Sequence, residues 1–298
     1  VFGEKLEGIL MTVVMIFSFI VPAFYPYDYK TQIKGSENLH PMQYSEKEIE
    51  RMDAGEKVFP HVLGTDKMGR DYAIRVMMGS RISLLVGIIA AAIILVIGSI
   101  FGSIAAFAGG WVDLIMMRIV DIIYSLPDLL MVILLSVVLG ETLGTAIKGT
   151  VFAKLGSNML SLFIVFGLLY WVSMARLVRG QILTIKQNDY VLASRAIGTP
   201  ASRIIRTHIL PNCLSVIIIS VALQIPSAIF TESYLSFLGL GVQAPMPSLG
   251  SLANAARDGL TSYPYKLIFP AVTIVLIVLA FNLLGDGLRD ALDPKLKK

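Results

Sequence analysis

Charged residues are scarce in this sequence: Asp, Glu, Lys and Arg make up 15% of its 298 residues. Soluble domains carry about 25% charged residues. Hydrophobic residues account for 55% of the chain, and the mean hydropathy is +0.74. This composition excludes an ordinary water-soluble domain. We therefore expect the lipid bilayer, rather than a water-excluded core, to determine the fold.

Residue types that carry chemistry are also few, with one cysteine and three histidines. The single Cys213 excludes a disulfide within the chain and is expected to be a small packing residue. The histidines are widely spaced and form no metal-site pattern with it. The sequence lacks the G-x-x-x-x-G-K pattern that cradles phosphates and shows no nucleophile–base arrangement. We predict no enzyme activity, no metal and no cofactor on this chain, and ATP should not bind to it.

Six apolar segments are candidates for membrane-spanning helices, each of which needs about 20 mainly apolar residues. They are residues 8–24, 82–112, 119–140, 155–175, 209–231 and 267–285. The third includes Asp121, Pro127 and Asp128, because its charge-free part alone is too short to span. The sequence thus predicts an all-α membrane protein with six transmembrane helices.

Basic residues indicate the orientation, because short loops rich in Lys and Arg remain in the cytoplasm. Segment 176–206 contains six Lys or Arg residues and a single acidic residue, Asp189. The tail after the last span adds Arg289, Lys295, Lys297 and Lys298. With six spans both segments lie on one side, so we expect cytoplasmic N- and C-termini. The modest net charge of +4 gives no indication of nucleic acid binding.

We predict two parts: residues 1–81, a first span with a long extracytoplasmic segment, and residues 82–298, a five-span core. In the outer segment, Ser45 and Glu48 predict a capping box that starts a short helix ended by Gly55. Residues 61–81 are glycine-punctuated and amphipathic, and we expect them to lie along the outer membrane surface.

The cytoplasmic sequence NDYVLASRAIGTPASRIIRTHILPN predicts two short helices. The first is expected over 189–197, capped by Asp189, with Gly198 at the position after its end. Thr199 can cap the second, which has Pro200 in its first turn and ends at Pro211. The pattern predicts a rigid peg with a glycine corner. Capping signals alone favour the other interpretation, a surface helix pair that holds a loop together.

This segment, 188–212, resembles the EAA coupling loop of the membrane subunits of bacterial ABC importers. That loop reads E-A-A, three residues, Gly, nine residues, then I-x-L-P. Leu192 and His208 stand where Glu and Ile are usual, so the resemblance supports the shape of the corner rather than a polar contact at Leu192. The residues assigned by it to ATPase coupling are Ala193, Ser194, Arg195, Gly198, Thr199, Pro200, Ala201, Arg203, His208, Leu210 and Pro211.

Other stretches resemble the permeases of the oligopeptide, dipeptide and nickel branch of that superfamily. The signature H-x-L-G-T-D-x-x-G-R-D is matched in the outer segment, and R-I-S-L follows at 81–84. ARLVRGQ at 175–181, LSFLGLGVQ at 235–243 and FNLLGDGLRDALDP at 281–294 also match. The extracytoplasmic motif residues are His61, Gly64, Thr65, Asp66, Gly69, Arg70 and Asp71.

The resemblance implies the second membrane subunit of a type I ABC importer, with a MetI-like transmembrane fold, in a bacterial or archaeal plasma membrane. It implies a second homologous permease subunit, two cytoplasmic ATPase subunits that hold ATP and Mg, and an extracytoplasmic substrate-binding protein. We expect import of oligopeptides or dipeptides by alternating access. Nickel and glutathione-type substrates stay open. So does an ion-coupled secondary transporter, although no internal repeat of the kind common in that class is found.

Ionisable residues inside spans are candidates for a pathway or gate. Asp128 follows Pro127, which should kink the helix, although Asp128 is equally suited to cap a helix start. Glu232 lies at the outer end of the fifth span, where it would contact substrate or lie at the membrane interface. Arg118 and Asp121 are three residues apart and could pair on one helical face.

Overall fold

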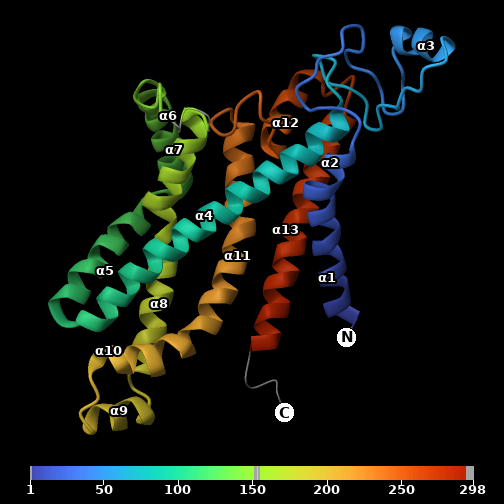
Figure 1. Cartoon of the computed structure of the whole chain (residues 1–298). Coiled ribbons are helices and arrows are strands. Elements are labelled where there is room, and N and C mark those ends of the chain that lie inside the picture. The colour runs from blue at the N-terminus through green and yellow to red at the C-terminus, as the bar shows by residue number, and fades with distance from the viewer. Residues whose placement is uncertain (1, 151–152, 154, 293–298) are drawn as a thin grey trace. The chain divides into compact units, whose positions relative to one another are not determined.

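The computed structural model describes residues 2–150, 153 and 155–292, and Figure 1 shows the order of its helices. Within these residues the regular structure is helical, apart from one isolated β-bridge between Thr65 and Asp71. The helices are α1 (Phe2–Met15), η1 (Ile16–Ile20), α2 (Val21–Phe24), α3 (Glu46–Asp53), α4 (Tyr72–Ala108), α5 (Gly110–Ser125), α6 (Asp128–Ala146), α7 (Ser157–Val165), η3 (Phe166–Tyr170), α8 (Trp171–Ile185), α9 (Asp189–Ala196), α10 (Ala201–Ile204), η4 (Ile205–Ile209), α11 (Leu210–Phe237), α12 (Leu249–Ala256), η5 (Arg257–Gly259) and α13 (Tyr265–Leu292).

Six helical stretches are long and apolar enough to cross a membrane, which confirms the predicted number. They are Glu7–Phe24, Tyr72–Ala108, Asp128–Ala146, Ser157–Ile185, Ile205–Phe237 and Tyr265–Leu292. A helix satisfies its own backbone polar groups, which hydrocarbon requires. The basic tail at 295–298, on which the predicted orientation partly rests, lies outside the described residues.

The starts of the second and third spans differ most from the prediction. The second span begins at Tyr72, so residues 72–81 form the first turns of α4 rather than a separate segment along the membrane surface. The third span begins at Asp128, because Leu126 and Pro127 are extended, with ψ of 142° and 108°. A residue before proline is driven out of the helical region. The chain therefore breaks into α5 and α6 instead of forming one kinked helix.

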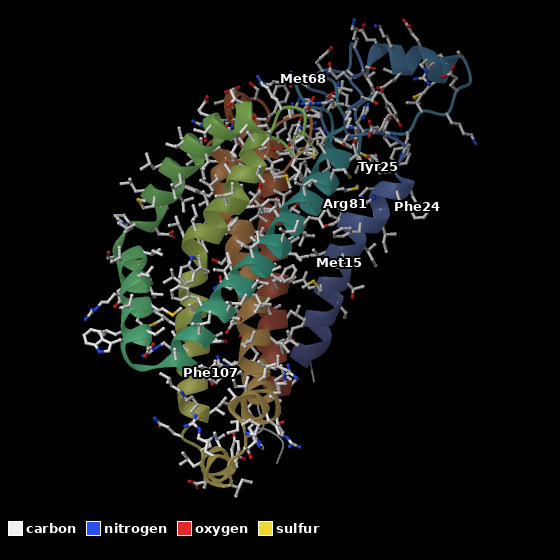
Figure 2. All side chains as sticks on the ribbon, turned by 60° about the vertical axis from the view of Figure 1, so that its left-hand side comes forward. Met15, Phe24, Tyr25, Met68, Arg81 and Phe107 are labelled. Atoms are coloured by element: carbon white, nitrogen blue, oxygen red, sulfur yellow. The ribbon has the colours of Figure 1, made fainter. Side chains whose placement is uncertain are left out.

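The chain divides into two compact units, each described here by itself. The first contains Val1–Val86 and Ile229–Ala280, and the second contains Gly87–Ala228 and Phe281–Lys298. In the first unit, Ala73, Ile74 and Met77 of α4 form a buried cluster against aromatic residues that follow the first span. Arg81, labelled in Figure 2, extends this contact, because its guanidinium lies 5.4 Å from the Phe19 ring centre.

In the second unit, α4 and α8 approach closely at two glycines. Gly98 and Gly102 are four residues apart and so share one helix face. A Cβ atom on Gly102 would lie 2.4 Å from the carbonyl oxygen of Ala175, and one on Gly98 would lie 2.6 Å from Met174 Cβ. Small residues at this spacing let two membrane helices pack backbone against backbone.

Candidate functional site

The predicted glycine corner is present at the end of α9. Gly198 has a φ of +81°. Its N–H donates to the carbonyl of Arg195 at 2.9 Å, and the Thr199 N–H donates to the carbonyl of Ser194 at 3.1 Å. These two bonds form a Schellman motif, whose left-handed residue is usually glycine because glycine has no Cβ to clash. Gly198 therefore ends the helix as its position in the sequence predicts.

The starts of the two helices in this segment differ from the prediction by one residue each. Asn188, rather than Asp189, occupies the cap position of α9. Pro200, rather than Thr199, directly precedes α10, and its carbonyl accepts the Ile204 N–H at 3.2 Å. Proline suits this position because it has no N–H that would be left unpaired.

The prediction that the second helix ends at Pro211 is wrong. α10, η4 and α11 follow one another without a break, and Pro211 is the second residue of α11. Proline removes a helical hydrogen bond and crowds the carbonyl four residues before it. The π-helical turn η4, in which the Leu210 N–H donates to the carbonyl of Ile205, accommodates this crowding. We name α9, the corner and α10–η4 the coupling segment; it is continuous with the fifth span.

The coupling segment is held together by contacts between its two arms. The Ser194 hydroxyl donates to the carbonyl of Tyr190 at 2.8 Å and lies 3.2 Å from His208 Nε2. The Tyr190 and His208 rings lie 5.7 Å apart, and Asn212 Nδ2 donates to the His208 carbonyl at 2.6 Å. His208, which stands where isoleucine is usual in the resembled loop, thus joins the arms by polar and aromatic contacts. Val191 is fully buried.

The coupling segment exposes both apolar and basic side chains in this chain. Ile197 at the corner is 83% exposed and Leu192 is 48% exposed. Arg195 and Arg203 are also exposed. Ala201 begins α10, but its side chain lies outside the described residues. Exposed large apolar residues on a rigid element are typical of a surface that binds another protein.

Charged pairs fix the helix that leads into the coupling segment. Arg179 of α8 donates from Nε and Nη2 to the two carboxylate oxygens of Asp113 on α5, each at 2.5 Å. These bonds, more than the nearby charges, hold the pKa of Asp113 below its usual value. Lys186, just after α8, donates to the carbonyl of Ala106 at 2.8 Å. α8 is therefore tied to both α5 and the end of α4.

The expected pairing of Arg118 with Asp121 is present at 3.8 Å. Asp121 lies nearer to Arg176 of α8, at 2.7 Å. The Arg176 guanidinium also lies 4.3 Å from the ring centre of Tyr124. The carboxylate of Asp121 thus forms a second link between α5 and α8.

The outer-segment motif is built around a fully buried histidine. His61 Nδ1 lies 2.7 Å from Asp71 Oδ2, and Nε2 lies 2.9 Å from Glu48 Oε1. The Tyr27 ring stacks on it at 4.6 Å. Asp71 also accepts the Ile74 N–H at 3.0 Å and so caps α4. Two carboxylates accept hydrogen bonds from one imidazole only if both ring nitrogens carry protons.

The pKa of His61 reflects two opposing influences. Burial, the larger single effect, lowers it, whereas the hydrogen bonds and charges of Asp71 and Glu48 together raise the pKa above its ordinary value. The folded segment thus holds the proton more tightly than the unfolded chain. The stabilisation is fully present below the unfolded pKa of about 6.5 and is lost as pH rises through the higher folded pKa.

We therefore expect α3 to be better protected near pH 6 than near pH 9, since the ordinary pKa of about 6.5 is raised here. Hydrogen exchange of α3 amides, corrected for intrinsic rates, measures this. His61→Gln should remove the pH dependence. His40→Gln, at an exposed histidine of the same segment, should retain it. Equal protection of the wild type at both pH values would contradict a charged His61.

The other motif residues shape the chain around this histidine. The Thr65 hydroxyl accepts the Leu39 N–H at 2.8 Å and donates to the carbonyl of Ser36. Gly64 and Gly69 have φ of +75° and +70°, and a Cβ on either would lie 2.2 Å from a backbone oxygen. Only glycine fits such positions. The motif is therefore a folding element of the outer segment.

Asp66 organises the end of the motif. Its Oδ1 accepts the backbone N–H groups of Met68 and Arg70, at 2.8 and 3.0 Å. Its Oδ2 accepts from Arg70 Nε at 2.7 Å and lies 3.4 Å from Arg75 Nε. One carboxylate thus stabilises a tight turn and lies beside two guanidinium groups.

The two predicted pathway residues lie in different surroundings. Asp128 is the first residue of α6, and its carboxylate lies 3.4 Å from the Tyr170 hydroxyl. It lines a cavity of about 580 Å³ in the second unit, together with Ser173 and Gln224. Glu232, in the first unit, is fully buried and accepts hydrogen bonds from the hydroxyls of Ser83 and Ser236, each at 2.7 Å. Glu232 has no exposed surface with which to contact a substrate in this conformation.

Sequence reasoning missed several residues that the structure places at these sites. Asp113 and Arg179 are 66 residues apart in the chain, and no spacing signal connects them. Glu48 was predicted as a cap residue and is one, because its Oε2 accepts the Ser45 N–H at 2.8 Å, but its second role against His61 carries no local pattern.

Residues 94–298 match the family described as "Binding-protein-dependent transport system inner membrane component". The oligopeptide transport system permease protein OppC of Bacillus subtilis (strain 168) is 42% identical, over 97% of this chain and 85% of its own length. The dipeptide permease protein DppC of the same organism is 49% identical, over 80% and 70%. The glutathione permease protein GsiD of Pectobacterium atrosepticum is 42% identical, over 80% and 73%.

Solved structures share the fold. A chain of the inward-facing MetNI methionine ABC transporter matches with a TM-score of 0.57 over 74% of this chain and 96% of that chain, at 19% identity. A chain of an amino acid ABC transporter matches with a TM-score of 0.54 over 74% and 95%, at 15% identity. The chain therefore belongs to the binding-protein-dependent transport system inner membrane components and is a multi-pass permease subunit of an ABC importer rather than an enzyme.

Proposed function

We propose that this chain carries peptides into the cytoplasm as one of two permease subunits of an ATP-driven importer. The coupling segment carries the proposal: it is a corner with exposed apolar and basic side chains, and it is continuous with a membrane span. The relatives named as oligopeptide and dipeptide permeases, at 42% and 49% identity, support peptides as the substrate class.

Energy comes from partner subunits in this proposal. Two cytoplasmic ATPases hold ATP and Mg, and each receives a coupling segment from one permease subunit. η4 and α11 follow one another without a break. A displacement of the corner by the ATPase is therefore transmitted to the fifth span. The cavity beside Asp128 is the part of the described chain that we assign to the pathway. Repeated closure of the ATPases would then change the side to which the pathway opens.

A second permease subunit and an extracytoplasmic binding protein complete the proposed assembly. Many apolar side chains of α6 are exposed in this chain, among them Leu130 at 62% and Leu134 at 51%, and lipid or the second subunit would cover them.

We further propose that both termini and the coupling segment lie in the cytoplasm. In a background without Cys213, a cysteine at Glu50, an exposed residue of α3, should react with a membrane-impermeant thiol reagent in intact cells. A cysteine at Lys186 should react only after the membrane is opened. Labelling of the Lys186 position from outside would reverse the orientation.

Uptake by cells with and without this subunit tests the substrate class. Labelled dipeptides and longer peptides should enter only cells that contain the chain, and nickel uptake should be unchanged. Glutathione is the second candidate, because a relative named as a glutathione permease is 42% identical. Loss of glutathione uptake alone, with normal peptide uptake, would replace the peptide assignment.

A further inference from the structure

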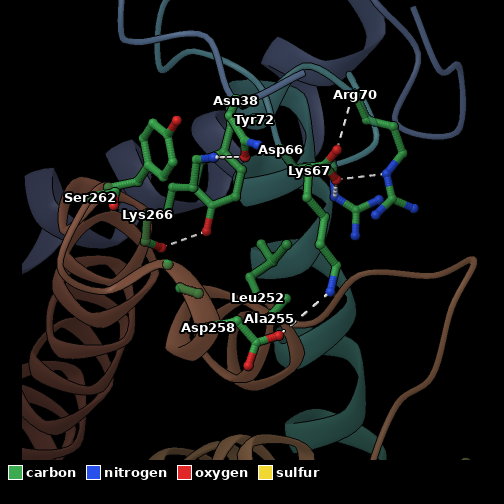
Figure 3. A pocket seen from close by; sticks show the side chains of 14 residues that line it. Asn38, Asp66, Lys67, Arg70, Tyr72, Leu252, Ala255, Asp258, Ser262 and Lys266 are labelled. Carbon is green, nitrogen blue, oxygen red and sulfur yellow. Dashed lines mark hydrogen bonds and ion pairs between the residues drawn. The ribbon is translucent and has the colours of Figure 1, made fainter. Parts of the chain in front are cut away.

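The first unit contains a cavity of about 280 Å³ that the proposed transport cycle does not use. It lies between the Asp66–Arg70 turn, the start of α4, α12 and the start of α13 (Figure 3). Its wall combines charged residues with the apolar side chains of Leu252, Ala255 and Ala256. The charged residues that line it are Asp66, Lys67, Arg70, Arg75, Asp258 and Lys266.

Positive charge exceeds negative charge in this wall, which has four cations and two carboxylates. Lys67 lies 3.7 Å from Asp258, and both side chains are exposed. The remaining carboxylate, Asp66, is shared by Arg70 and Arg75. Arg75 is 6% exposed, and its Nε has no hydrogen-bond partner among the described residues. Asp66 therefore cannot fully balance the guanidinium groups beside it.

Lys266 is the least compensated of these cations. It is 7% exposed, and its ammonium donates to Asn38 Oδ1 at 2.7 Å, as the dashed line in Figure 3 shows. It also lies 4.2 Å from the ring centre of Tyr263. Within the described part of the chain, no carboxylate oxygen lies within 4.0 Å of it. An ammonium has three donors, so bonding capacity remains.

We propose that this cavity binds the C-terminal carboxylate of a peptide, with Lys266 and Arg75 as the groups that bind it. A buried cation without a counter-ion is unfavourable, and an entering carboxylate relieves this cost. α13 begins at the cavity, and the positive end of its dipole favours an anion. Leu252 and Ala255 offer an apolar wall to the terminal side chain.

The size of the cavity limits what it holds. Pockets for whole small ligands are usually about 300–1,000 Å³. A cavity of about 280 Å³ suits one terminal residue rather than a whole peptide, which leaves the rest of the chain outside. This inference rests on the proposed peptide substrate and names the group of the peptide that is recognised.

Equilibrium binding of tri-alanine and of tri-alanine amide to the assembled transporter in lipid nanodiscs, without nucleotide or binding protein, tests the site. Tri-alanine should bind at least about tenfold more tightly than its amide, the ratio expected when one charge-assisted hydrogen bond is lost. Lys266→Met, which keeps an unbranched apolar stem, should remove this preference. Lys47→Met, at an exposed lysine of the same unit but outside the cavity, should not.

Asn38→Asp supplies the proposed site with a carboxylate that belongs to the chain itself. The Asn38 amide oxygen lies 2.7 Å from the Lys266 ammonium. The substitution replaces this amide by a carboxylate and so gives Lys266 a counter-ion. Asn38 has a φ of +57°, which aspartate also tolerates. The variant should fold at least as stably as the wild type, yet lose the preference for tri-alanine over its amide. It therefore separates loss of binding from loss of folding.

Each outcome decides between the alternatives. Equal binding of tri-alanine and its amide to the wild type would overturn the carboxylate site while peptide uptake, and so the proposed function, still stood. If Lys266→Met and Asn38→Asp instead weakened only docking of the binding protein, the carboxylate would belong to that protein, and the assignment of this cavity to a peptide C-terminus would be wrong. Absence of peptide uptake by the wild type would reject the proposed function itself.

Discussion

Replacing Gly198 with valine should leave the chain inserted in the membrane but reduce peptide uptake per inserted molecule by about tenfold or more, the effect of roughly 1.4 kcal/mol on a rate. A Cβ at this position would meet nothing within 4 Å, so the added Cβ does not collide with neighbouring segments. The substitution acts mainly through the φ of +81°, which a β-branched residue rarely adopts. The local cost is about 1–2 kcal/mol. The corner should change its angle rather than unfold.

The consequence is large because the corner determines where Ile197 lies. That side chain is 83% exposed, at the tip of the proposed contact with the ATPase. Co-purification of the ATPase should weaken together with uptake. Gly198→Asn is the matched control, because asparagine adopts the left-handed conformation more readily than other residues. It should retain most of the uptake. Normal uptake in Gly198→Val at normal abundance would show that the corner does not couple the ATPase to the spans.

Features that depend on neighbours in sequence were predicted well. The number of spans follows from apolar length alone. The capping-box glutamate Glu48, the end of α3 before Gly55 and the corner at Gly198 follow from local backbone chemistry, since each involves residues within a few positions of one another. The exact helix starts were off by one, because Asn188 and Asp189 are both good cap residues and the sequence does not choose between them.

Features that depend on distant residues could not be predicted. Pro211 carries a strong stop signal, but whether the helix ends there or absorbs the proline through a π turn depends on the packing of the fifth span. The identity of the partners of His61 and Arg179 depends on long-range folding. A G-x-x-x-G pattern at Gly98–Gly102 is visible in the sequence, yet the pattern does not reveal which helix it meets.

A substitution at the contact between α4 and α8 should have the second large effect. Gly102→Ala should destabilise the permease strongly, because the added Cβ would lie 2.4 Å from the carbonyl oxygen of Ala175 and 3.1 Å from the backbone nitrogen of Arg179. A backbone atom cannot rotate away as a flexible side chain can, so α4 and α8 must separate. Overpacking of this kind costs about 1–3 kcal/mol or more. The separation should also strain the bonds that Arg179 makes to Asp113.

The matched control is the same substitution at Gly180, in α8 itself, where an added Cβ meets nothing within 4 Å. Gly180→Ala should be neutral or stabilising by up to about 1 kcal/mol, because alanine favours a helix more than glycine does. Thermal unfolding of the purified chain in detergent, with the yield of inserted protein measured alongside, compares the two variants. Gly102→Ala should unfold at clearly lower temperature and accumulate poorly, whereas Gly180→Ala should match or exceed the wild type. Equal unfolding temperatures for both would mean that α4 and α8 do not pack backbone against backbone at Gly102.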